Sequence, residues 1–99
     1  MAEMGRAIVM SPEDNTAVAL ADLAAGEDVS LKIAGRTVTT RLLDAVGFGH
    51  KFALKDIAAG EKVFKYGTVI GLASSAIASG QHVHIHNVES IRARGDKKK

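Results

Sequence analysis

Hydrophobic and polar residues alternate along much of this chain, in short runs that glycine-containing turns separate. The alternation is plainest at 29–33 (VSLKI) and 37–43 (TVTTRLL), on either side of the short sequence AGR. Two alternating runs joined by a glycine turn are typical of a β-hairpin with one buried face. Further short runs of this kind lie at 6–10, 16–20, 50–54, 62–67, 68–73 and 82–88. The pattern therefore predicts an all-β domain, a small barrel-like or sandwich-like module with little helix.

One segment also fits a helix. In the sequence SPEDNTAVALADLAAG at 11–26, Ser11 is a potential helix cap and Pro12 would occupy the first helical position. The alanines that follow favour a helix, whereas the alternation in TAVAL at 16–20 favours a strand. We expect the strand and keep the helix as the alternative.

One short pattern occurs three times, as DLAAGEDV at 22–29, DIAAGEKV at 56–63 and AIASGQHV at 76–83. Each copy has an aliphatic residue, two small residues, glycine, Glu or Gln, any residue and then valine. The intervals between the copies are unequal, which argues against a repeat solenoid. We predict a recurring turn in which the glycine adopts the left-handed conformation and the flanking aliphatic residues point inward. The residues concerned are Leu23, Gly26 and Val29, then Ile57, Gly60 and Val63, then Ile77, Gly80 and Val83.

The composition is that of one small globular domain. The chain has 99 residues, of which 46% are hydrophobic and 24% charged. Five of its 13 basic residues lie at 92–99, whereas residues 1–91 hold eight basic and ten acidic residues. We therefore expect a single domain over 1–91 followed by a basic, disordered tail at 92–99. Because the domain itself is slightly acidic and lacks a basic stripe with aromatics, we expect no nucleic-acid partner.

Several functional classes have no support in the sequence. There is no cysteine, so disulfides, thiolate ligands and thiol nucleophiles are excluded. No apolar run approaches the roughly 20 residues that span a bilayer, and the first ten residues do not resemble a signal peptide. We expect a cytoplasmic protein without a membrane partner. No zinc-protease helix, nucleophile elbow or phosphate-binding loop is present.

Three of the four histidines lie in GQHVHIHN at 80–87. On a strand, residues two apart lie about 6.6 Å apart on one face, so His82, His84 and His86 would share a face. Two imidazoles at that spacing can converge on one cation, but the outer two would be about 13 Å apart on a straight strand. We therefore expect at most two as ligands, with His50, after the sequence GFG, as a further imidazole. A solvated edge strand without chemistry and a pH-sensitive element remain alternatives.

Two lysines are candidates for binding an anion. Lys51 follows His50 directly, and Lys65 lies just before Gly67, where a chain reversal would place it at a rim. Both can hold a carboxylate through charge-assisted hydrogen bonds. The alternative for each lysine is plain solvation at the surface.

The longest informative string is GHKFALKDIAAGEKVFKYGTVIGLASSAIASGQHVHIHNVE at 49–89. It resembles the amino-terminal SAF-type domain of the altronate and galactarate dehydratase family, and also the small subunit of sulfolactate sulfo-lyase. The earlier sequence DNTAVALADLAAGE is similar more loosely. One departure is Gln81, where the family more often has Glu. The resemblance implies a β-clip fold, which agrees with the all-β prediction.

The resemblance also implies a function. Family members of the dehydratase type are carbon–oxygen lyases that remove water from a sugar acid, and they depend on a divalent metal, typically iron or manganese. The resemblance implies that a separate large catalytic subunit completes the enzyme, so we expect the isolated chain to be inactive. A homodimer of the isolated chain would also be compatible with exposed strand edges. A non-catalytic SAF-type binding or assembly module and a sulfo-lyase subunit are the alternatives.

The candidate site residues follow from this resemblance and from the histidine pattern. We expect His84, His86 and His50 as metal ligands or catalytic groups. We expect the anionic substrate to contact Lys51, Lys65, His82 and Asn87.

Overall fold

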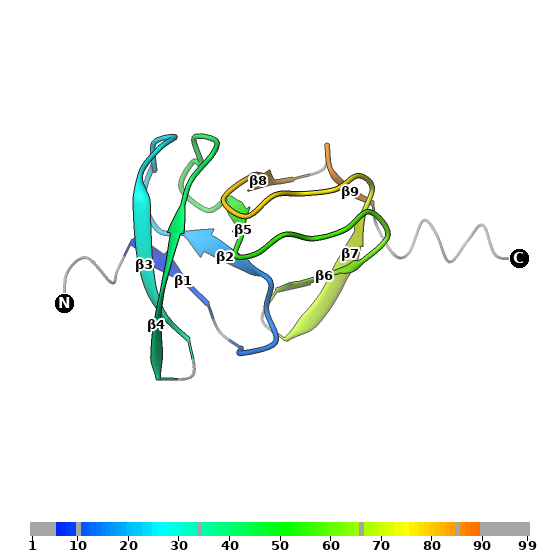
Figure 1. The fold of residues 1–99 in the computed structure, drawn as a ribbon, viewed down its shortest axis with the longest axis horizontal. Helices are drawn as coiled ribbons and strands as arrows, with labels where there is room; N and C mark the ends of the chain where they lie inside the picture. The colour runs from blue at the N-terminus through cyan, green and yellow to red at the C-terminus, as the bar shows by residue number, and fades with distance from the viewer. Residues whose placement is uncertain (1–5, 10, 34, 66, 85, 90–99) are drawn as a thin grey trace, which may run out of the picture.

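The computed structural model describes residues 6–9, 11–33, 35–65, 67–84 and 86–89, and these residues form nine strands (Figure 1). The strands are β1 (Ala7–Ile8), β2 (Thr16–Ala19), β3 (Asp28–Ile33), β4 (Arg36–Arg41), β5 (Lys51–Ala53), β6 (Lys62–Lys65), β7 (Thr68–Ala73), β8 (His82–Val83) and β9 (Val88–Glu89). The described residues contain no helix, and hence none that could span a membrane. The all-β prediction is confirmed, and the alternative helix over 11–26 is wrong because β2 lies within it. The predicted tail at 92–99 lies outside the described residues.

The strands form three small antiparallel sheets. The central sheet has the order β1-β2-β5-β8, the second is the hairpin β3-β4, and the third has the order β6-β7-β9. Figure 1 shows the hairpin β3-β4 on one side of the central sheet and β6-β7-β9 on the other. The predicted hairpin is confirmed, with Leu31 paired to Val38 and Ile33 paired to Arg36.

The segment 82–88 does not form the single strand that its alternation predicts. Instead, β8 pairs with β5, β9 pairs with β7, and the chain turns between them. The side chain of Asn87 explains the break, because its Oδ1 accepts the N–H of His84 (2.9 Å) and its Nδ2 donates to the carbonyl of His82 (2.8 Å). Asn87 is 2% exposed. These bonds replace strand pairing within the loop, so the histidines do not lie along one straight strand.

The predicted turn occurs at all three expected positions and at a fourth. Gly26, Gly60 and Gly80 have φ of 86°, 88° and 86°, and Gly49 has φ of 83°. The turns are joined in two pairs by isolated antiparallel bridges, Leu23 with Val46 and Ile57 with Ile77. We call residues 22–27 with 43–50 the first turn pair, and residues 56–61 with 74–81 the second turn pair. The fourth turn escapes the sequence pattern because His50 stands where the others have Glu or Gln.

Each turn pair lies over its own hydrophobic core. The aliphatic residues predicted to point inward are all buried, at 3% exposure or less. One core contains Ala7, Ala17, Ala19, Leu23, Val29, Leu31, Leu42, Val46 and Phe52, and the other contains Ala53, Ile57, Val63, Ala73, Ile77 and Val83. The two cores meet at β5, where Phe52 faces one and Ala53 the other. Alternation along β5 therefore separates the faces of the central sheet.

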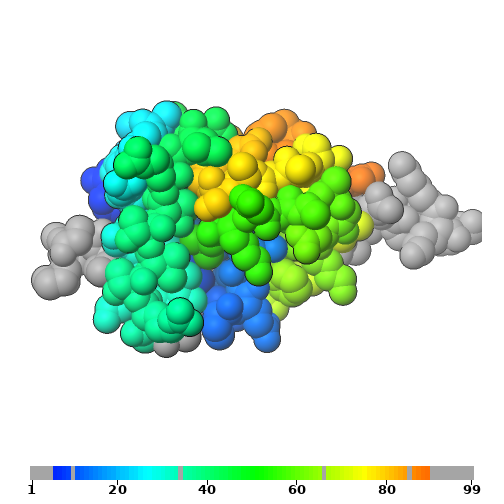
Figure 2. Space-filling model, viewed as in Figure 1, coloured from blue at the N-terminus to red at the C-terminus, as the bar shows by residue number. Residues whose placement is uncertain are grey.

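The two turn pairs are packed against each other through Gly80. Its N–H donates to the carbonyl of Ala53 (2.8 Å), and its own carbonyl accepts the N–H of Leu43 (2.9 Å). Figure 2 shows this segment, in yellow, between green segments on either side. The contact places the start of β8 beside the loop that leads to His50.

Candidate metal centre

Three imidazoles converge where β5 begins and β8 begins. His50 lies directly before β5, and His82 is the first residue of β8, where it pairs with Phe52. The Nδ1 of His50 and the Nε2 of His82 are 3.0 Å apart. The possible ligand atoms of His50, His82 and His84 all lie within 4.8 Å of one another. We call these three residues the histidine cluster; none of them is buried.

The rings of the histidine cluster lie close and are nearly parallel in one case. The ring centroids of His50 and His84 are 5.0 Å apart, and those of His82 and His84 are 5.5 Å apart with an interplanar angle of 12°. With one ligand atom of each ring within 4.8 Å of the others, the three rings are close enough for one ion to reach all of them. A neutral imidazole nitrogen is a common ligand of transition metals.

His86 has a different place from the one that strand geometry suggests. Its ring centroid is 5.5 Å from that of His82, far closer than the roughly 13 Å of a straight strand. The expectation of a straight histidine strand is therefore wrong, because Asn87 turns the chain back. The group within ligand distance contains His82 together with His50 and His84, and the exposed His86 contacts His82 from outside it.

Two aspartates that the sequence analysis did not single out hold the loops of the cluster. The Oδ2 of Asp44 accepts the N–H of His82 (2.9 Å), and the Oδ1 of Asp22 accepts the N–H of Phe48 (2.9 Å), two residues before His50. The same bond recurs in the second turn pair, where Asp56 accepts the N–H of Ser79 (2.9 Å). For Asp22 the available signal was its position directly before the first aliphatic residue of the turn pair, which Asp56 shares; Asp44 carried no such signal.

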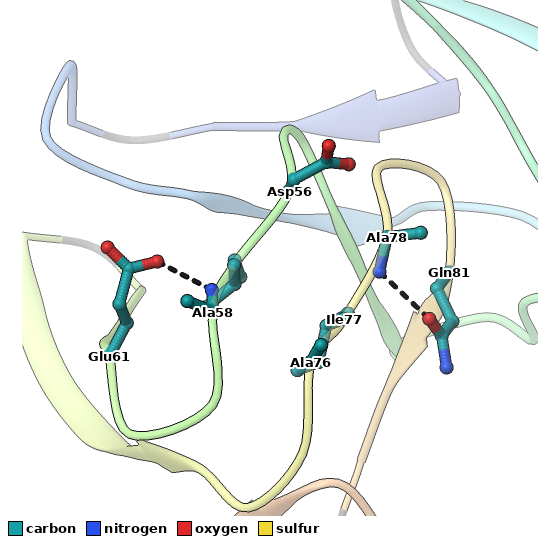
Figure 3. Close-up of a pocket in the computed structure, with 8 residues that line it drawn as sticks. Asp56, Ala58, Glu61, Ala76, Ile77, Ala78 and Gln81 are labelled. Atoms are coloured by element: carbon teal, nitrogen blue, oxygen red, sulfur yellow. Dashed lines mark hydrogen bonds between the residues drawn. The ribbon is translucent and has the colours of Figure 1, made fainter.

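In the other three turns, the residue at the position of His50 stabilises the turn through its side chain. There the side chain after the glycine accepts the N–H of the residue three positions earlier: Glu27 from Ala24 (3.0 Å), Glu61 from Ala58 (2.7 Å) and Gln81 from Ala78 (2.9 Å). Figure 3 shows the last two of these bonds. Gln81 therefore does the same work as the Glu residues.

In the fourth turn the equivalent backbone hydrogen bond is present, but the side chain of His50 makes a different contact. The N–H of His50 donates to the carbonyl of Gly47 (2.9 Å), as the equivalent N–H groups do in the other turns. Its imidazole meets His82 instead of capping the turn. The imidazole is thus not needed to form this turn.

The surroundings of His82 favour its uncharged form. Burial lowers the pKa of His82, and the nearby His50, His84 and His86 lower it further, while Asp44 acts in the opposite direction. Metal ligation requires a deprotonated ring nitrogen. The direction of the pKa shift is therefore the one that suits a metal ligand.

The two candidate lysines lie apart from the histidine cluster. Successive side chains on a strand point to opposite faces, so Lys51 faces away from Phe52 and from the preceding His50. Burial lowers the pKa of Lys51, and the neighbouring Lys65 on β6 lowers it further. The structure thus brings Lys51 and Lys65 together but does not bring them to the histidines. Asn87 is also not free to face a ligand, since both ends of its amide bond the backbone.

Three polar residues at the start of β2 fix the hairpin that carries Lys65, and the sequence analysis attached no role to them. Asn15 accepts the N–H of Phe64 (2.8 Å), Thr16 donates to the carbonyl of Phe64 (2.7 Å), and Asp14 accepts the N–H of Gly67 (2.7 Å). All three are buried. The available signal was the sequence DNT at 14–16, polar residues that lead directly into the apolar residues of β2.

An open pocket lies on the second turn pair, and none of the three residues of the histidine cluster lines it. Asp56, Ile57, Ala58, Glu61, Ala76, Ile77, Ala78 and Gln81 line it (Figure 3). The three polar side chains of this lining bond backbone N–H groups of the turns. The groups suited to chemistry therefore lie at the histidine cluster.

These features define a small all-β domain that carries a surface cluster of three imidazoles, a candidate metal centre. The model of the altronate/galactarate dehydratase SAF domain matches residues 5–91. The chain therefore belongs to this family of SAF domains.

Curated relatives extend this finding. The chain is 56% identical over 77 residues to an altronate dehydratase of Escherichia coli and 35% identical over 83 residues to one of Bacillus subtilis. It is 44% identical over 57 residues to a (2R)-sulfolactate sulfo-lyase subunit alpha of Chromohalobacter salexigens. The matched regions are 78%, 84% and 58% of this chain, but 15%, 16% and 61% of the respective relatives. The chain thus spans a small part of the altronate dehydratases that it matches.

Proposed function

We propose that this chain is the small, metal-binding part of a lyase that removes water from a sugar acid such as altronate or galactarate. A separate large catalytic subunit supplies the rest of the active site. The observation that carries the proposal is the histidine cluster, in which the imidazole of His50 comes from a turn that does not need it. The relatives named altronate dehydratase support the substrate class.

The donor set fits a divalent transition metal. Neighbouring ligands of an ion with bonds near 2.1 Å lie roughly 3 to 3.4 Å apart, and the nitrogens of His50 and His82 are 3.0 Å apart. Imidazole ligands suit iron, as they also suit zinc, copper and nickel, whereas manganese prefers oxygen ligands. Between the two metals that the resemblance to the dehydratase family implies, the ligand type favours iron. We therefore propose iron first and manganese second, held by His50, His82 and His84.

The chemistry of the lyase assigns tasks to the residues around the ion. Elimination next to a carboxylate needs a proton taken from carbon, stabilisation of the negative charge that develops, and a proton given to the leaving hydroxyl. A bound metal would supply the charge stabilisation as a Lewis acid. His86, exposed beside His82, is placed to act as a general acid or base. Because Lys51 lies on the opposite face of its strand, we expect a small acid to contact the histidines. Lys51 and Lys65 would then form a separate place for an anionic group to bind.

Removal of water and removal of sulfite are two outcomes of the same chemistry. The sulfo-lyase relative is named subunit alpha, and the matched region covers 61% of it, a larger share than in the dehydratases. This observation favours sulfolactate as the second candidate substrate.

The test compares histidine variants in the complete enzyme. The chain is co-purified with the polypeptide that carries the remaining lyase region, and bound iron, manganese and turnover of altronate, galactarate and sulfolactate are measured. We expect His50→Gln and His82→Gln to weaken metal binding by at least about a hundredfold and to abolish turnover, because each removes a ligand. His86→Gln should keep its metal and lose turnover.

The control is Lys32→Gln on the exposed surface of β3, which should keep both metal and turnover. Unchanged metal content and turnover in both His50→Gln and His82→Gln would contradict the proposed site. Turnover by the isolated chain with added metal would contradict the need for a second subunit.

A further inference from the structure

Two large apolar side chains stand out on the first turn pair because they are exposed. Leu43 is 55% exposed and Phe48 is 67% exposed. A single exposed apolar residue on a protein surface is ordinary. Leu43 and Phe48 differ from that case because they can be compared with the residues at the equivalent positions of the second turn pair.

The second turn pair is that reference. Gly49 and Gly80 are equivalent because each N–H donates to the carbonyl of a strand residue at 2.8 Å. The acceptor is Ala19 for Gly49 and Ala53 for Gly80. Phe48 is therefore equivalent to Ser79, and both of their N–H groups bond an aspartate at 2.9 Å. By the same alignment Leu43 is equivalent to the exposed Ser74.

The comparison shows which side chains the turns require and which they do not. The corresponding turn forms with serine at both positions in the second turn pair, with the same glycine and aspartate hydrogen bonds. The apolar side chains of Leu43 and Phe48 are thus not required for the turns. A large exposed aromatic group that the fold does not require is typical of a binding surface.

Both residues flank the histidine cluster along the chain. Phe48 lies two residues before His50, and Leu43 directly precedes Asp44, whose carboxylate bonds the N–H of His82. The histidine cluster itself is not buried. An active site for elimination works best with water excluded, so the cluster needs a cover.

We propose that Leu43 and Phe48 dock the catalytic region of the lyase, which closes over the histidine cluster. This inference rests on the proposed function and adds the surface through which the two parts meet. The occupant follows from the chain lengths. The chain corresponds to only 15% of the Escherichia coli altronate dehydratase, and the sulfo-lyase relatives are named as one subunit of an enzyme. The larger remainder is the polypeptide available to cover the site.

The test measures binding between this chain and the large polypeptide by calorimetry, with both partners purified. The variant Leu43→Ser with Phe48→Ser copies the residues of the second turn pair, so it should fold as the wild type does. We expect binding to weaken at least about tenfold, because truncation of a buried aromatic anchor typically has this effect or a larger one. The matched control is Ala76→Ser on the second turn pair, which should bind as the wild type does.

Metal content and thermal unfolding of each variant distinguish this inference from the proposed function. Weakened binding by a folded variant that still holds metal supports the docking surface. Unchanged binding by the double variant overturns it, whatever the lyase activity of the complex. A wild-type complex that forms but turns over none of the three acids contradicts the proposed function alone. If sedimentation shows a dimer of the isolated chain that the double variant abolishes, the surface belongs to a second copy and the assignment to the catalytic region is overturned.

Discussion

The two turn pairs share a backbone and differ in what they present to the surface. The second turn pair has Ser74, Ser79 and Gln81 where the first has Leu43, Phe48 and His50. In the second, the polar side chain after the glycine bonds the turn itself; in the first, the imidazole at that position reaches the histidine cluster. The glycine, the aliphatic residue and the aspartate are enough to form the turn. The other positions are therefore open to binding and chemistry.

This difference has a consequence for stability. Among the described residues, the N–H of Gly47 has no side-chain acceptor of the kind that Glu27, Glu61 and Gln81 provide in the other turns. His50 thus joins the histidine cluster and leaves this turn without a side-chain cap. At functional sites, a residue that would stabilise the fold is often replaced by one that serves binding or catalysis.

The largest expected effect distinguishes two glycines that have the same backbone conformation. Gly26 and Gly80 both have φ of 86°, but a Cβ at Gly26 would meet nothing within 4 Å, whereas one at Gly80 would overlap the carbonyl of Arg41. We expect Gly26→Ala to lower the free energy of unfolding by about 1 kcal/mol through backbone strain. Gly80→Ala should lower it by about 3 kcal/mol, because overpacking adds to the same strain. Urea denaturation measures both values, and equal losses would show that the packing of the two turn pairs through Gly80 is not tight.

A smaller effect of opposite sign is expected at the fourth turn. His50→Gln introduces the side chain that caps the equivalent turn at Gln81, so it should raise the free energy of unfolding by about 1 kcal/mol. For a domain of this size the midpoint of thermal unfolding should rise by about 4–8 °C, measured with a chelator present. The reference variant Gln81→Ala should lower stability by a similar amount. A lower midpoint for His50→Gln would mean that the imidazole itself stabilises the metal-free fold.

The smallest effect concerns pH. The folded pKa of His82 is lowered below its usual value, so the unfolded chain takes up a proton first as the pH falls. The contribution of His82 to stability is therefore complete above about pH 6.5 and is lost as the pH falls from there through the folded pKa. The groups that face it are His50, His84, His86 and Asp44.

Thermal unfolding of the metal-free chain between pH 7 and pH 5 measures this effect. We expect the midpoint of the wild type to fall more steeply than that of His82→Gln, which has no titrating group at this position. Parallel curves would contradict the lowered pKa of His82. The second turn pair contains no histidine, so any difference between the curves reports on the histidine cluster.

Much of the fold was accessible from the residue pattern, and the arrangement of the site was not. The alternation at 29–33 and 37–43 predicted the hairpin β3-β4, and the glycine pattern predicted three turns. The fourth turn was missed because Phe48 and His50 replace the residues that make the pattern visible. The straight strand predicted over 82–88 was wrong because local alternation does not reveal that the amide of Asn87 would take over the backbone bonds of the loop.

The sequence by itself determined the all-β class, the positions of three turns and the family, and it singled out the histidines as candidate site residues. These follow from local properties: alternation of side chains, the conformational freedom of glycine, and motifs that are continuous along the chain. Only the tertiary structure decided that His82 belongs with His50 and His84, and that Lys51 faces away from them. His50 and His82 lie 32 residues apart, and strand pairing between β5 and β8 brings them together. Such long-range pairing depends on the packing of two cores around one strand, which no local pattern specifies.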